Sequence, residues 1–147
     1  MSISYKTIFN TVISISFYFL SVSIKSQEII DQSNVKIYHH HKTYFKVFVD
    51  HTKRLMISKS CSKDITPFSK CQAAKSLFNV KLSDIKNKRV GGKNPGSLLC
   101  KYSTDGEVIF AKDLKGRNTT FCQFQDKSMV ASHTLYYFAS KNKEQRK

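Results

Sequence analysis

The chain has 147 residues, of which 25 are Lys or Arg and only 10 are Asp or Glu, so its formal net charge is +15. This length accommodates one domain, or two at most. A hydrophobic share of 40% with only 5 Gly and 2 Pro excludes a collagen-like or low-complexity chain and is typical of a packed globular core.

Residues 1–26 have the composition of a secretory signal peptide. They contain no acidic residue, and Lys6 precedes an apolar run over residues 7–24. This pattern predicts export, with cleavage after Ser23 or Ser26. The alternative is a retained membrane anchor, which the polar residues inside the run disfavour. Cleavage would leave 23 basic and 10 acidic residues, a charge of +13, and no other segment is apolar enough to span a bilayer.

The first half of the mature chain, residues 27–89, forms an N-terminal basic part. Residues 43–49 are rich in β-branched and aromatic side chains, which predicts a strand. Thr66-Pro67 has the form of a helix cap followed by proline at the first helical position, so we expect a helix over residues 67–78. A basic connector follows over residues 80–93.

The second half, residues 90–140, contains a second cap. Asn94-Pro95 predicts a helix over residues 95–102. Residues 107–112 and 119–125 read as two strands of a hairpin. Residues 129–139 are apolar but fit a strand or a helix equally well.

Residues 141–147 form a charged tail. Together these elements predict a small disulfide-stapled α+β domain with two short helices and an antiparallel hairpin or sheet.

All four cysteines follow the predicted signal peptide, at Cys61, Cys71, Cys100 and Cys122. An even number in an exported chain favours two disulfides and a secreted or periplasmic location. Three pairings are open, and we favour Cys61–Cys71 with Cys100–Cys122 because each pair lies within one local unit. Zinc is the alternative, but the gaps of 9, 28 and 21 residues contain no Cys-x-x-Cys spacing.

Part of the second half shows a family resemblance. The matching residues are Asn94, Pro95, Ser97, Cys100, Cys122, Phe124, Asp126 and Ser128. They resemble a bacterial domain-of-unknown-function family that carries a hemolysin label. The resemblance covers about a third of the chain and departs from the family pattern at Gly96, Gln125 and Lys127. It implies a small exported bacterial α+β domain without an established reaction.

We interpret the matching residues as determinants of the fold. Helix caps, turn residues and buried cysteines account for each of them, and none needs a chemical role.

The histidines are the first chemical candidates. In a strand His39 and His41 would share one face and His40 the other, and two imidazoles make a weak metal site. We therefore predict no metal and no cofactor, with a solvated strand edge as the simpler interpretation.

A nuclease would need a general base, a general acid and a cation at the phosphate. His51 and His133 with a Lys or Arg could supply them, but no motif supports the arrangement. Gly-x-Ser-x-Gly, Walker and dinucleotide-binding patterns are absent from the sequence. We therefore assign no catalytic residue.

The basic residues are the remaining feature. One group comprises Lys81, Lys86, Lys88, Arg89, Lys93 and Lys101, and a second comprises Lys53, Arg54, Lys59, Lys63, Lys70 and Lys75. Such charge attracts nucleic acid, anionic lipid or acidic glycan. The predicted function is non-enzymatic, non-specific binding at an anionic surface or polyanion, because lysine dominates the charge. The alternative is a small secreted hydrolase such as a ribonuclease.

Overall fold

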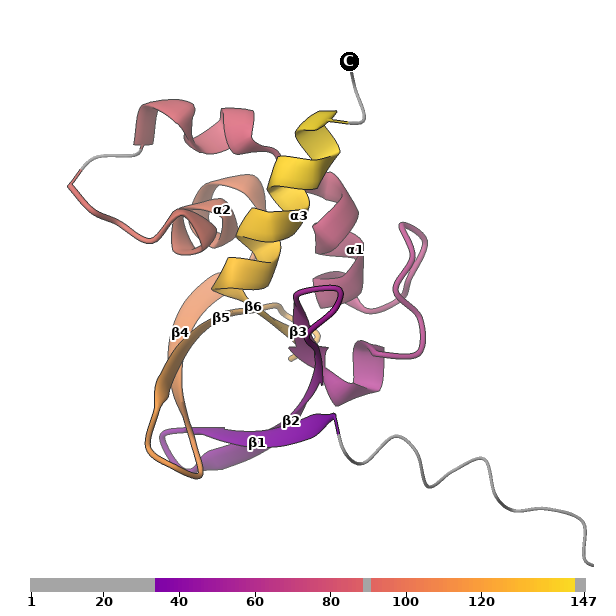
Figure 1. Cartoon of the computed structure of the whole chain (residues 1–147), viewed down its shortest axis with the longest axis vertical. Helices are drawn as coiled ribbons and strands as arrows, with labels where there is room; N and C mark the ends of the chain where they lie inside the picture. The colour runs from indigo at the N-terminus through magenta and orange to yellow at the C-terminus, as the bar shows by residue number, and fades with distance from the viewer. Residues whose placement is uncertain (1–33, 89–90, 145–147) are drawn as a thin grey trace, which may run out of the picture. The chain divides into compact units, whose positions relative to one another are not determined.

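The computed structural model describes residues 34–88 and 91–144 (Figure 1). The predicted signal peptide and Arg89 lie outside these residues. Six strands pair antiparallel and close into a barrel in the order β1-β2-β3-β6-β5-β4. The strands are β1 (Val35–His40), β2 (Thr43–Asp50), β3 (Leu55–Ser58), β4 (Glu107–Asp113), β5 (Asn118–Gln123) and β6 (Met129–Ala131).

The helices of the described residues gather on one side of this barrel. They are the α-helices α1 (Gln72–Asn79), α2 (Pro95–Ser103) and α3 (Ser132–Glu144) and the 3-10 helices η1 (Lys59–Cys61) and η2 (Leu82–Lys88). Figure 1 shows α1, α2 and α3 together beside β3, β6 and β5, while the β1–β2 hairpin curves away from them. Within residues 34–88 and 91–144 no helical segment combines the length and hydropathy of a bilayer-spanning helix.

The α+β class is confirmed, but the expectation of a hairpin or simple sheet is corrected by the closed barrel. The predicted hairpin exists as β4 and β5, yet its other edge pairs with β1 at Tyr38↔Asp113. The second closing contact is the single pair Ile57↔Val130 between β3 and β6. Strands from both sides of the expected boundary at residue 90 therefore share one barrel. Such long-range pairs leave no local signal in the sequence.

Two apolar cores lie on the two faces of the barrel wall. Strand residues alternate between them, so Phe121 faces the barrel interior and Cys122 faces the helices. The interior core consists of Tyr38, Val47, Val49, Ile109, Ala111, Phe121, Met129 and Ala131. The second core joins β3, β5 and β6 to the helices, with Leu77, Leu99 and Leu135 fully buried at its centre.

The start of α2 is as predicted. The Asn94 side chain accepts hydrogen bonds from the backbone N–H groups of Gly96 (2.9 Å) and Ser97 (3.4 Å), and Pro95 occupies the first turn. Leu98, Leu99 and Cys100 face inward. Asparagine is a strong capping residue, so this local signal is sufficient.

The predicted start of α1 at Pro67 is wrong. The helix begins at Gln72, because Cys71 is extended and forms the cap while the Thr66 hydroxyl donates to Asp64 instead (3.0 Å). Two distant side chains then cap the first turn. Asp126 accepts from the Gln72 N–H and Ser128 Oγ from the Ala73 N–H, both at 2.9 Å.

The ambiguous segment 129–139 is both structures in succession. It begins as strand β6 and continues without a loop into α3, which extends to Glu144 and thus into the expected tail. β6 has only three residues, but it pairs with a strand on each side, β3 and β5, in the barrel.

Both disulfides are present in the favoured pairing. Cys61–Cys71 joins η1 to the start of α1, and Cys100–Cys122 joins α2 to β5. Each bridge therefore attaches a helix to a neighbouring segment of the fold, and the second lies in the fully buried core.

Candidate functional site

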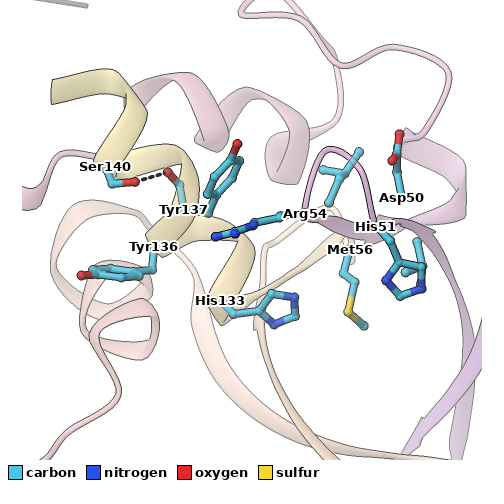
Figure 2. A pocket seen from close by; sticks show the side chains of 10 residues that line it. Asp50, His51, Arg54, Met56, His133, Tyr136, Tyr137 and Ser140 are labelled. Atoms are coloured by element: carbon cyan, nitrogen blue, oxygen red, sulfur yellow. Dashed lines mark hydrogen bonds between the residues drawn. The ribbon is translucent and has the colours of Figure 1, made fainter. Parts of the chain in front are cut away.

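A cavity of about 400 Å³ lies between the turn joining β2 to β3 and one face of α3. Its lining consists of Val49, Asp50, His51, Arg54, Leu55, Met56, His133, Tyr136, Tyr137 and Ser140. Figure 2 shows the imidazoles of His51 and His133 on either side of the Met56 side chain, with the Arg54 guanidinium nearby. The structure thus brings together two histidines that are 82 residues apart in the sequence.

The β2–β3 turn positions His51 and Arg54. The Arg54 N–H donates to the His51 carbonyl (3.3 Å), and Arg54 takes a left-handed backbone conformation with φ of 50°. Asp50 precedes the turn and accepts from the Thr52 hydroxyl (2.6 Å) and the Lys53 N–H (3.1 Å). These hydrogen bonds hold the pKa of Asp50 below its ordinary value. In Figure 2 the carboxylate points away from the imidazoles.

Thr134 attaches the start of α3 to this turn. Its side chain is fully buried, and its hydroxyl donates to the Arg54 carbonyl (3.1 Å) and accepts from the Met56 N–H (3.0 Å). Because His133 is the adjacent residue, the same contact places its imidazole beside the cavity.

Substitution of Thr134 by Val should therefore destabilise the fold. The change removes both hydrogen bonds and leaves the Met56 N–H beside an apolar methyl group, which costs about 1–3 kcal/mol of unfolding free energy. Urea unfolding followed by circular dichroism measures the loss. Thr134→Ser retains the hydroxyl and should lose clearly less, and equal losses in the two variants would contradict a role for these hydrogen bonds.

Arg54 is held on the face of an aromatic ring. Its guanidinium carbon lies 5.3 Å from the centre of the Tyr137 ring, and that ring packs edge-on against Phe138 at 5.6 Å. An exposed cation–π contact contributes about 0.5–1 kcal/mol, enough to orient the side chain without neutralising it. The cavity therefore has a permanent, oriented cation.

His133 differs from a fully solvated histidine. His133 is an exposed residue, but the neighbouring protein partly desolvates its ring and lowers its pKa below the ordinary 6.5. At pH 7 the imidazole is then uncharged and can accept a proton or a hydrogen bond. The cavity thus combines an uncharged imidazole, a second histidine and a guanidinium.

The first predicted basic group lies elsewhere, around Tyr102 on α2. The ammonium groups of Lys88 and Lys101 each lie 5.4 Å from the centre of its ring. Lys81 precedes η2, Lys86 lies within it and Lys93 precedes α2, and all three are exposed. Asp84 lies among them and accepts from the Ser103 hydroxyl. The described lysines of this group are spread over an exposed surface.

The weak metal candidates His39 and His41 do not share a strand face. β1 ends at His40, and His41 lies in the turn with φ of 51°. The His40 and His41 rings are 4.1 Å apart, and His39 packs against Tyr44 at 5.5 Å. No three His, Cys, Asp or Glu side chains in the described part of the chain gather as a metal site would require.

The residues behind the family resemblance have structural contacts. Asn94 and Pro95 start α2, Asp126 and Ser128 cap α1, and Phe124 is buried. Ser97 lies 3.4 Å from Ser132 between the Oγ atoms, a contact between α2 and α3 that the sequence did not indicate. None of these residues lines the cavity.

Sequence reasoning paired His51 with His133 only as one of many combinations and placed Arg54 in a diffuse basic group. The aromatic lining residues Tyr136 and Tyr137 were not anticipated. The sequence predicts no turn at residues 51–54, because it does not indicate strand β3, which follows this turn.

In comparisons with known proteins, no family model, no curated protein and no solved structure matches this chain. The resemblance in residues 94–128 therefore stays a prediction.

Proposed function

We propose that this is an exported basic protein that binds anionic polymers, with the cavity of His51, Arg54 and His133 as its anion site. The observation that carries the proposal is the meeting of these three side chains in one partly enclosed space. Two disulfides fit an oxidising compartment, in agreement with the signal peptide expected at residues 1–26.

The chemistry of the cavity suits a phosphate, sulfate or carboxylate group. A guanidinium presents several N–H donors in a plane, and each imidazole adds one. His51, Arg54 and His133 are exposed like the lysines, but they line one cavity, so their donors can converge on a single anion. The surrounding excess of positive charge accelerates the encounter.

Arg54→Gly tests the site without a penalty to the turn. The left-handed φ of 50° is a conformation that glycine adopts freely, so the variant should fold while losing the cation. We expect its affinity for heparin to fall about tenfold, the effect of losing one charge-assisted interaction. A salt gradient on immobilised heparin and a calorimetric titration measure the change.

Lys93→Ala is the matched control, because it removes one positive charge from the predicted lysine group and leaves the cavity intact. Only a small shift in elution is expected. If both variants lose affinity equally, binding is diffuse and the cavity is not the site. If the wild-type protein elutes at low salt, polyanion binding itself is wrong.

Cleavage of RNA is the second candidate, favoured by the placement of two histidines beside one cation. One imidazole would take the proton of the ribose 2′-hydroxyl, whose oxygen attacks the adjacent phosphorus. The other would protonate the departing 5′-oxygen, and Arg54 would stabilise the charge on the phosphoryl oxygens. His133 suits the base role, because its lowered pKa keeps it unprotonated at pH 7.

RNA incubated with the protein in EDTA distinguishes this candidate from binding alone. His51→Ala and His133→Ala should each reduce cleavage by about a hundredfold or more, and a 2′-deoxy substrate should be inert. Because a base is active only when unprotonated, the rate should persist below pH 6.5 and fall as pH drops through the lowered pKa of His133. An acidic limb above pH 6.5 would exclude His133 as the base, and no cleavage at all would leave the binding function alone.

A further inference from the structure

Two aromatic rings are exposed on the barrel wall that faces away from the helices. Tyr44 of β2 is 66% exposed and Phe110 of β4 is 69% exposed, although both lie in regular strands. Their neighbours along each strand, Val47 and Ile109 among them, fill the barrel interior. The rings therefore point outward, where they contribute nothing to the interior core.

Strand register places these rings on one continuous surface. β1 lies between β2 and β4, with His39 paired to Tyr44 on one side and to Lys112 on the other. Phe110 follows two residues away on the same face of β4. We call this surface the aromatic wall, and it consists of Ile37, His39, Tyr44, Lys46, Phe110 and Lys112. Tyr44 and Phe110 lie two strands apart, with His39 and Lys112 between them.

The aromatic wall is positively charged. Lys46 and Lys112 are exposed and none of its six residues is acidic. β4 carries two acids outside the wall: Glu107 is exposed at the start of the strand, and Asp113 is buried and bound by Arg117, with 2.6 Å between the guanidinium nitrogen Nη2 and Oδ2. A ligand on this surface therefore meets flat apolar rings alternating with cations.

This combination selects among anionic polymers. An acidic polysaccharide supplies charge and sugar faces but no planar base, and a nucleic acid duplex keeps its bases inside. A single strand offers phosphates to the lysines and base faces to the rings, which is how proteins bind single-stranded nucleic acid without sequence preference. We propose that the aromatic wall is a stacking platform for single-stranded nucleic acid. The inference rests on the proposed polyanion function and names its ligand class.

The test uses fluorescein-labelled oligothymidine of 12 nucleotides, because DNA avoids cleavage, together with an abasic strand that carries the same phosphates. Fluorescence anisotropy with the full chain gives both affinities. The wild-type protein should bind oligothymidine at least tenfold more tightly than the abasic strand. In the double variant Tyr44→Leu with Phe110→Leu, which keeps apolar surface but removes the rings, that preference should disappear while heparin binding is unchanged.

Leu114→Ala is the matched control, since Leu114 is 70% exposed in the β4–β5 turn but has no ring, and it should keep the preference. Equal wild-type affinity for the two strands, or an unaffected double variant, overturns the platform while the polyanion function stands. If the wild-type protein binds neither heparin nor either strand, the platform and the polyanion function are both overturned. If the wild-type protein sediments as a dimer and the double variant does not, the wall binds a second copy of the chain instead. If the double variant loses binding to anionic phosphatidylglycerol vesicles but keeps oligothymidine binding, the wall binds a membrane instead.

Discussion

Replacement of Gly96 by Ala should lower the free energy of unfolding by about 3 kcal/mol or more, because the added methyl group has no room. A Cβ atom at Gly96 would lie 1.8 Å from the Ser132 carbonyl oxygen and 2.3 Å from its carbon. These are backbone atoms at the start of α3, so no side-chain rotation relieves the overlap. In an exposed helix the same change stabilises by about 1 kcal/mol, so the expected sign is reversed here.

Thermal and urea unfolding of Gly96→Ala measure this effect, with Lys101→Ala on the exposed face of α2 as the control. The control should stay within about 0.5 kcal/mol of the wild-type protein. Because Ser132 precedes His133, displacement of α3 should also weaken heparin binding at the cavity. A Gly96→Ala variant as stable as the wild-type protein would show that α2 and α3 do not meet this closely.

Removal of the Cys100–Cys122 bridge by the double substitution Cys100→Ala and Cys122→Ala should cost about 3 kcal/mol and lower the Tm by about 10–20 °C. The bridge closes a sequence separation of 22 residues, and both cysteines are fully buried between α2 and β5. Its loss therefore increases the freedom of the unfolded chain and also opens the core. Calorimetry of both forms measures the difference.

The second bridge is the internal comparison. Cys61–Cys71 has a separation of only 10 residues, and Cys71 is partly accessible, so its double alanine variant should lose less stability. A thiol reductant should also open this bridge first, because attack requires access to a sulfur atom. Alkylation of the freed thiols, followed by peptide mass analysis, identifies the order. Simultaneous opening, or the reverse order, would contradict the burial argument.

Local elements with strong chemical signals could be predicted from the sequence. Asn94-Pro95 started α2 as expected, since the capping amide acts within three residues. The β4–β5 hairpin was found for a similar reason, because its strands are joined by a short turn. The start of α1 was missed because its first turn is capped by Asp126 and Ser128, more than 50 residues away.

The candidate site could be predicted only as a set of residue types. His51 and His133 could be named as groups that bind or cleave a phosphodiester, but 82 residues separate them. Their meeting depends on β6 continuing directly into α3 and on Thr134 attaching that helix to the β2–β3 turn. His39 and His41, in contrast, are close in the sequence but do not share a strand face. β1 ends at His40, and His41 already lies in the turn.

The sequence alone determined the charge, the four cysteines that predict two disulfides, the capped helix and the hairpin. Each of these depends on composition or on residues close along the chain. The tertiary structure decided that six short strands close into a barrel, that Arg54 and two histidines line one cavity and that Tyr44 and Phe110 are exposed. These outcomes depend on which segments share a buried surface. Burial is a property of the whole packed chain, so no local pattern in the sequence contains it.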